Sequence, residues 1–150
     1  MIPIKPHAYA ELPQDFYNLQ NWQGFNNPLL VIENAQLKQE LGLENIEKQK
    51  LLDIFNGLLS IKNLKPLSMA YSGHQFGQYV EQLGDGRGLL LGKVDSSEGL
   101  VDIHLKGAGK TPYSRFGDGR AVLRSVIREY LCGDINEALH KLSVEGKWEE

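Results

Sequence analysis

The sequence contains a single cysteine, Cys132, among its 150 residues. One cysteine cannot form a disulfide within the chain, which fits a reducing compartment and our expectation of a cytoplasmic location. The four histidines lack metal-ligand spacing, both with one another and with Cys132; they are His7, His74, His104 and His140. No zinc site is therefore expected, and we interpret Cys132 as a small packing residue.

The chain also lacks a long apolar run and a strong excess of either charge. No stretch approaches the roughly 18 apolar residues that a membrane helix needs, and the opening MIPIKPHAYAELPQDFYNLQNW has no apolar core of a secretory signal. Sixteen Lys and Arg against 19 Asp and Glu give a net charge of −3, which argues against general binding to nucleic acids or membrane surfaces. The 41% of apolar residues suffice for the core of about one domain.

The first half of the chain predicts packing elements without evident chemistry. The apolar run PLLVIEN at 28–34 predicts a strand. The stretch NAQLKQELGL at 34–43 predicts a short helix, with Asn34 as its N-cap and Gly42 as its C-cap. Apolar residues at helical spacing in IEKQKLLDIFNGLL, residues 46–59, predict a second helix that packs on the core.

The second half predicts three strands. QYVEQL at 78–83 and LLLGKV at 89–94 flank the glycine-rich GDGRG, so we expect them to form a hairpin closed over that loop. In LVDIHLKG at 100–107, apolar and polar residues alternate, which predicts a half-buried strand with Lys106 on its polar face. The three strands would form an antiparallel meander.

A glycine-rich loop, GAGKTPYSRFGDG at 107–119, then leads into a helical pattern. From Arg120 onward, six apolar residues form one stripe: Val122, Leu123, Val126, Ile127, Tyr130 and Leu131. Arg124 and Arg128 follow Arg120 on another face, and Glu129 falls at the border of the apolar stripe, away from the arginine row. We therefore expect Glu129 to point along the edge of the helix that faces the sheet.

The tetrapeptide GDGR occurs twice, at 84–87 and at 117–120. A glycine loop between strands lets backbone amides approach phosphates, a lysine on the next strand can neutralise phosphate oxygens, and a helix carboxylate can hold that lysine. This order of parts is that of a protein-kinase N-lobe. The spacing matches neither the kinase G-x-G-x-x-G nor the P-loop G-x-x-x-x-G-K-[ST].

Each of these residues also has a purely structural interpretation. Gly-Asp-Gly is a good hairpin turn, and most strand lysines, as Lys106 could be, are simply solvated. Asp118 is an ordinary N-cap candidate before a helix, and Arg120 could be surface charge. Glu129 could pair with Ser125 or with an arginine on its own helix. Taken one at a time, the structural interpretations outweigh the functional ones.

Two longer stretches, AYSGHQFGQYVEQLGDGRGLLLGKV and DIHLKGAGKTPYSRFGDGRAVLRSVIREYL, closely resemble the selenoprotein-O (SelO/YdiU) family, most strongly over 69–133. The resemblance implies a pseudokinase that transfers AMP from ATP to Ser, Thr or Tyr hydroxyls of proteins, with Mg²⁺ or Mn²⁺. It implies an α+β fold in which residues 69–150 form a kinase-like N-lobe, with an antiparallel sheet and a helix C equivalent. Residues 1–68 would form an N-terminal extension with short helices. The implied partners are ATP and protein substrates, and neither nucleic acid nor membrane.

The resemblance also assigns roles position by position. The implied nucleotide contacts are Gly84, Gly86 and Arg87 in the first GDGR, Lys106, and Asp118 and Gly119 in the second. Glu129 is the implied carboxylate that supports Lys106. The two GDGR copies would then form two walls of one nucleotide pocket.

The sequence ends before the family's catalytic Asp, its metal-binding Asn and Asp, and two further phosphate-contacting arginines. We therefore expect catalytic residues and metal ligands in a C-lobe that this chain lacks, and little or no transferase activity from the chain alone. About three extra residues after REYL would also rotate Glu137 and His140 around the helix relative to other members. Two alternatives stay open: a truncated, non-enzymatic fragment with at most weak nucleotide binding, and a protein phosphotransferase.

Overall fold

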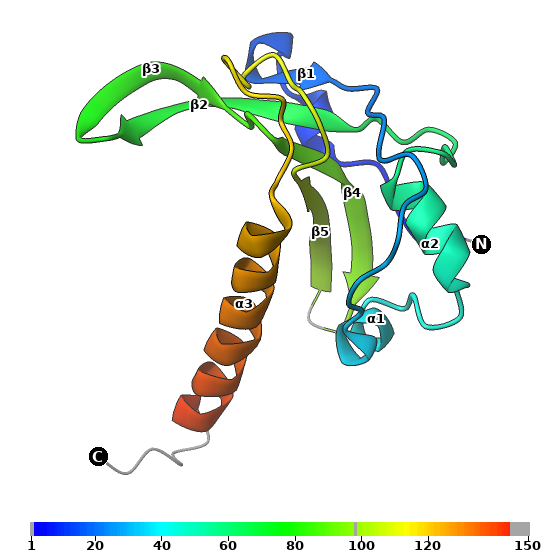
Figure 1. The fold of residues 1–150 in the computed structure, drawn as a ribbon. Coiled ribbons are helices and arrows are strands. Elements are labelled where there is room, and N and C mark those ends of the chain that lie inside the picture. The colour runs from blue at the N-terminus through cyan, green and yellow to red at the C-terminus, as the bar shows by residue number, and fades with distance from the viewer. Residues whose placement is uncertain (1, 98, 145–150) are drawn as a thin grey trace. The chain divides into compact units, whose positions relative to one another are not determined.

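A computed structural model describes residues 2–97 and 99–144, with residues 134–144 described through their backbone alone. Contacts within the chain divide it into two compact units, residues 1–120 and residues 121–150. The first unit combines an antiparallel sheet with short helices, and the second contains one long helix (Figure 1). The α+β composition predicted from the sequence is confirmed. None of the described helices combines the length and apolar character needed to cross a membrane.

Ten elements follow one another along the described chain. The N-terminal ones are η1 Ala8–Glu11, η2 Gln14–Phe16, β1 Tyr17–Leu19, α1 Ala35–Glu40 and α2 Lys48–Phe55. The others are β2 Leu67–Gln75, β3 Gln78–Gly84, β4 Gly88–Ser96, β5 Gly99–Lys106 and α3 Leu123–Val144. The strands form one sheet in the order β1-β2-β4-β5, and β3 pairs with β2 beside this path. All these pairings are antiparallel.

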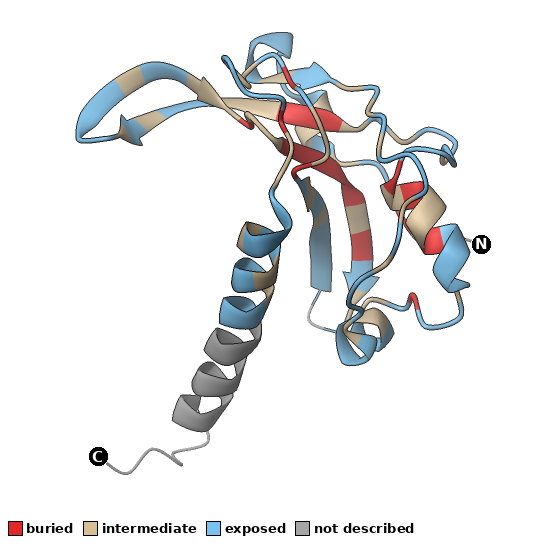
Figure 2. Ribbon diagram, viewed as in Figure 1, coloured by how far each residue is buried: buried red, intermediate tan, exposed pale blue. Residues whose placement is uncertain are grey.

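The core of the first unit lies between the sheet and α2. Its buried residues come from the chain start, from α2 and from β4; they are Ile4, Ile54, Leu91 and Val94. Figure 2 shows buried positions along β4, β2 and the inner face of α2. Ile103 and Leu105 of β5 pack against this core, so the alternating residues Asp102, His104 and Lys106 occupy the opposite face of the strand.

Several predicted elements are confirmed. Helix α1 lies within 34–43 and begins as expected, because the Asn34 side chain accepts a hydrogen bond from the Leu37 amide at 3.0 Å. Helix α2 lies within 46–59 but ends at Phe55. Strands β4 and β5 pair along their length, as the meander predicts. A long helix follows the second GDGR.

Two predictions are wrong. The run at 28–34 forms no strand: Leu29 and Val31 are 86% and 65% exposed, so their apolar character does not mark a buried edge. Strand β3 does not pair with β4 across the first GDGR. It forms a hairpin with β2, closed by the two-residue turn Phe76–Gly77, in which both residues have positive φ. Strand β2 escaped prediction because Ser72, Gly73 and His74 interrupt its apolar pattern.

The chain preceding α1 is an integral part of the sheet. Strand β1 pairs with the start of β2, and Lys5 pairs with Lys93 of β4 through two backbone hydrogen bonds of 2.8 and 3.0 Å. His7 Nε2 lies 2.9 Å from an Asp102 carboxylate oxygen on β5. The predicted N-terminal extension therefore contributes a strand and a bridge to the sheet that carries the candidate site.

Candidate functional site

The first GDGR connects β3 to β4, which are not neighbours in the sheet. Asp85 is only 8% exposed, and its carboxylate accepts a hydrogen bond from the Met69 amide at 3.0 Å. His104 Nε2 on β5 lies 3.5 Å from the same carboxylate. Asp85 thus anchors the loop to β2 and faces β5, and the role of its neighbours Gly84, Gly86 and Arg87 as nucleotide contacts stays a prediction.

The loop after β5 docks onto this turn. The Thr111 hydroxyl donates to the Asp85 carbonyl at 2.7 Å, and the Ser114 hydroxyl donates to the Gly86 carbonyl at 2.5 Å. Tyr113 lies so close that a Cβ added at Gly84 would be 2.3 Å from its ring. The absence of a side chain at Gly84 is therefore required by the packing of Tyr113, before any ligand is considered.

The second GDGR closes the same loop at its far end. Ala108 and Arg120 form an antiparallel bridge, and the Gly109 amide donates to the Gly119 carbonyl at 3.2 Å. Gly119 is buried with φ +71°, and a Cβ there would lie 1.9 Å from the Gly109 carbonyl oxygen. Asp118 accepts a hydrogen bond from the Arg120 amide at 2.9 Å, as a local cap.

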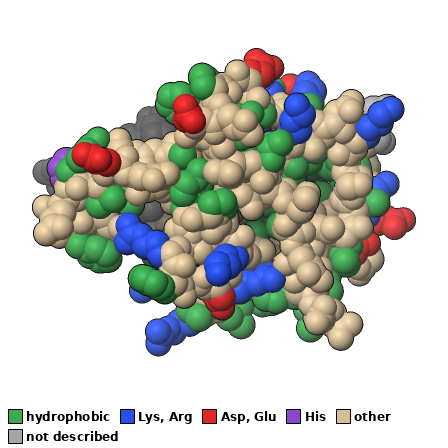
Figure 3. All heavy atoms as spheres, turned by 90° about the horizontal axis from the view of Figure 1, so that it is seen from above, with side chains coloured by type: hydrophobic (Ala, Val, Ile, Leu, Met, Phe, Trp, Pro, Cys, Tyr) green, Lys and Arg blue, Asp and Glu red, His purple; other side chains and the backbone are tan. Residues whose placement is uncertain are grey.

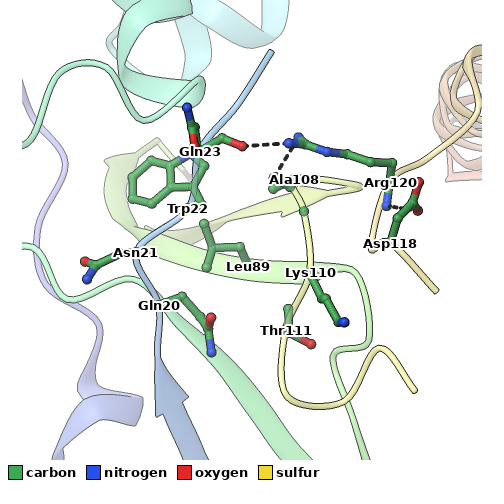
Figure 4. A pocket seen from close by; sticks show the side chains of 12 residues that line it. Gln20, Asn21, Trp22, Gln23, Leu89, Ala108, Lys110, Thr111, Asp118 and Arg120 are labelled. Atoms are coloured by element: carbon green, nitrogen blue, oxygen red, sulfur yellow. Dashed lines mark hydrogen bonds between the residues drawn. The ribbon is translucent and has the colours of Figure 1, made fainter. Parts of the chain in front are cut away.

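Arg120 joins this loop to the N-terminal part of the chain. Its guanidinium donates to the carbonyl oxygens of Ala108 at 3.0 Å, Gln23 at 2.8 Å and Gly24 at 3.2 Å. Its Cζ lies 4.8 Å from the centre of the Phe25 ring, in cation–π geometry. Figure 4 shows the guanidinium reaching across to the 20–23 segment beside the cavity. Arg120 is thus a structural clamp and not a solvated surface charge.

We expect Arg120→Ala to destabilise the first unit by about 2–3 kcal/mol, because three carbonyl groups lose a charged donor. Arg120→Lys should recover only part of this loss, since an ammonium lacks the planar fork that reaches several carbonyls. Urea unfolding measures both values, with Arg124→Ala, a change of an exposed arginine on α3, as the matched control. Equal stability of the Arg120 and Arg124 variants would contradict the clamp.

Lys106 ends β5 on the exposed face of the strand. It lies opposite Gly88, the first residue of β4, so its side chain starts beside the end of the first GDGR. Glu129 lies on α3, in the second unit. The pairing of Lys106 with Glu129 would join the two units and stays a prediction.

Two cavities of the first unit adjoin the loops. The first, about 250 Å³, is lined by the 20–23 segment, the start of β4, the 108–111 segment, Asp118 and Arg120 (Figure 4). The second, about 450 Å³, is lined by Gly84, Gly86, Tyr113 and residues around them. The two GDGR copies therefore adjoin different cavities of this unit, and the single pocket with two walls stays a prediction. Lys106 and Arg87 line neither of these two cavities.

Basic and acidic side chains both lie on the surface of the protein. On the face seen from above, Lys and Arg side chains are interspersed with Asp and Glu (Figure 3). Partial desolvation, followed by the negative charge of Asp85, raises the pKa of the Tyr71 hydroxyl above its ordinary value of 10.0. Within the described part of the chain, His, Cys, Asp and Glu form no group of three that could hold a metal ion.

Sequence comparison now identifies the family. The profile of the family described as "Protein adenylyltransferase SelO" matches residues 5–147, which is nearly the whole chain. The chain belongs to the SelO family. The resemblance noted from the two GDGR stretches is confirmed, and the match extends it over the N-terminal segment that the structure places in the sheet.

Curated SelO relatives are named "Protein nucleotidyltransferase YdiU". The protein of Vibrio vulnificus strain YJ016 is 52% identical over 139 residues, covering 91% of this chain and 28% of the relative. Those of Vibrio parahaemolyticus and Hydrogenovibrio crunogenus are 50% and 51% identical over 129 and 147 residues, covering 85% and 94% of this chain. The chain spans 26% and 30% of these two relatives. The predicted transferase class is thus supported at the level of the family.

The sequence interpretation missed three contributors to the site. The 20–23 segment lines the first cavity, although nothing in its composition marks it as functional. Thr111 and Ser114 hold the first GDGR through bonds that span 26 and 28 residues of sequence, a distance at which no periodic pattern exists. The sequence pattern that could have pointed to Thr111 and Ser114 is GAGKTPYS. Its glycines and proline predict a loop, but they do not show which residues the loop contacts.

Proposed function

We propose that this chain forms the ATP-binding, kinase-like N-lobe portion of a protein adenylyltransferase, which transfers AMP from ATP to Ser, Thr or Tyr hydroxyls of proteins. The match to the SelO family over residues 5–147 carries this proposal. The proposed nucleotide contacts are those assigned by resemblance: Gly84, Gly86, Arg87, Lys106, Asp118 and Gly119.

The geometry of the first unit is compatible with this role. Lys106 stands on the exposed face of β5, opposite Gly88, where a cationic group could neutralise phosphate oxygens. The 107–120 loop contains the second GDGR, is closed by the Ala108–Arg120 bridge, and bonds to the first GDGR through Thr111 and Ser114, so it fixes the spacing of the two copies. Glu129 would orient Lys106 if α3 takes the place of a kinase helix C.

The described residues offer donors for a nucleotide but no ligand set for the expected Mg²⁺ or Mn²⁺. Lysine, arginine and backbone amides suit phosphate groups, whereas a divalent cation needs clustered carboxylate or amide oxygens. In the proposed enzyme, such ligands and the catalytic base come from parts of a full-length member beyond this chain.

The proposal is tested by incubating a full-length protein that contains this chain with ATP, Mg²⁺ or Mn²⁺ and a protein acceptor. Mass spectrometry of the acceptor should show AMP on hydroxyl side chains. Phosphate on the same side chains would replace the proposal by phosphotransfer, since the two additions differ greatly in mass. Strong labelling by the 150-residue chain alone would contradict our expectation that this part only binds nucleotide.

A further inference from the structure

Three successive carbonyl groups of the first GDGR, those of Asp85, Gly86 and Arg87, accept hydrogen bonds from the 107–114 segment. The donors, in the same order, are the Thr111 hydroxyl at 2.7 Å, the Ser114 hydroxyl at 2.5 Å and the Gly107 amide at 2.7 Å. A single short segment thus holds every carbonyl oxygen of the turn between Gly84 and Gly88.

This arrangement fixes where the amides of the turn point. The carbonyl and the amide of one peptide unit point in opposite directions, so the amides of Arg87 and Gly88 are directed away from Ser114 and Gly107. Because the Gly107 amide bonds to the Arg87 carbonyl, Gly88 and Lys106 form a non-hydrogen-bonded pair, in which side chains approach most closely. Lys106 therefore starts beside Gly88, whose own amide points away from β5.

An anion is attracted by amide groups and repelled by carbonyl oxygens. The side of the turn that faces 111–114, where Tyr113 and the second cavity lie, presents carbonyl oxygens. The Gly86 amide donates to the Gly84 carbonyl at 2.8 Å, and the amides of Arg87 and Gly88 point to the opposite side. Only that side suits a phosphate group, and the two hydroxyls keep the carbonyl oxygens turned away from it.

We propose that Thr111 and Ser114 are positioning residues that orient the first GDGR to receive the phosphate groups of a nucleoside triphosphate. This inference rests on the proposed function, in which the same turn contacts ATP. Neither hydroxyl needs to touch the nucleotide. Without them, the Asp85 and Gly86 carbonyls lose their partners, and the flexible peptide units beside Gly86 can rotate a carbonyl oxygen toward the anion.

The test compares Thr111→Val and Ser114→Ala with the unaltered full chain. Thr111→Val keeps the shape of the side chain but removes its hydroxyl, and Thr111→Ser retains the donor as a rescue variant. Ser96→Ala is the matched control, because the Ser96 hydroxyl also donates to a backbone carbonyl, that of Gly99 at 3.0 Å in the β4–β5 turn. Calorimetry with ATP plus Mg²⁺, and separately with uncharged adenosine, measures each affinity.

We expect Thr111→Val and Ser114→Ala each to weaken ATP binding about five- to tenfold, the loss of one hydrogen bond to the loop. Adenosine affinity should stay within about twofold of the unaltered chain, since adenosine carries no phosphate. Thr111→Ser and Ser96→Ala should bind ATP normally. An equal loss for ATP and adenosine would indicate general disruption, and unchanged ATP affinity would show that the hydroxyls do not orient the loop; either result overturns the inference.

A second measurement separates this inference from the proposed function. If the unaltered chain binds no ATP, the proposed function fails. The orientation of the turn is then judged by nuclear magnetic resonance of the Arg87 and Gly88 amides, whose signals must shift in Thr111→Val and Ser114→Ala but not in Ser96→Ala. Unshifted amides would refute the positioning role independently of any nucleotide.

Discussion

Replacing Lys106 by alanine is expected to lower ATP-dependent labelling of a protein acceptor about 100-fold or more in a full-length protein that contains this chain. Lys106 ends β5 opposite Gly88, the residue that directly follows the first GDGR. Removing it leaves the developing phosphate charge without its proposed partner. Labelling rates under saturating ATP, read by mass spectrometry, measure the effect.

Two controls show whether the loss belongs to this lysine. Lys62→Ala removes an exposed lysine between α2 and β2 and should leave labelling unchanged. Glu129→Gln should lower labelling less than Lys106→Ala, because it loosens the proposed partner of the lysine without removing the charge that meets phosphate. Full activity of Lys106→Ala would refute the assignment, and full activity of Glu129→Gln alone would refute only the pairing.

The sequence predicts well those parts of the fold that depend on local periodicity. Alternation in 100–107 identifies β5 and the face on which Lys106 lies, because burial of every second residue is a local pattern. Asn34 identifies the start of α1, because its cap bond spans three residues. The position of β3 is not local: the Phe76–Gly77 turn, which supplies no Asn-Gly signal, pairs β3 with β2 and not with β4.

The same distinction applies to the site. The family resemblance identifies the two GDGR copies as candidate nucleotide contacts. It does not show that the loop after β5 connects them, bonding to the first copy and ending in the second. That loop is attached by side-chain-to-backbone bonds from Thr111, Ser114 and Arg120, the last reaching residues 96 and 97 positions away. Such contacts depend on the tertiary arrangement, and each residue type is common in solvated loops. Their roles therefore emerge only from the structure.

Gly119→Ala is expected to cause the largest loss of stability in the first unit, at least about 3 kcal/mol. A Cβ at this position would lie 1.9 Å from the Gly109 carbonyl oxygen, and φ is +71°, where an L side chain adds its own strain. Both effects act on backbone that is already paired in the Ala108–Arg120 bridge, so no flexible side chain can move aside. Urea unfolding of the full chain measures the loss.

Gly117→Ala is the control within the same tetrapeptide. Its Cβ would be 3.2 Å from the Ser114 carbonyl oxygen, a tight contact without the left-handed backbone, so we expect a loss below about 1 kcal/mol. The comparison separates two reasons for a glycine at 119. If Gly119→Ala folds with normal stability and loses only ATP affinity, the position serves the nucleotide, and the bridge is not what requires glycine. If Gly119→Ala unfolds while Gly117→Ala does not, the Ala108–Arg120 bridge is what requires glycine at 119. Any contact of the second GDGR with ATP then depends on the structure that this bridge maintains.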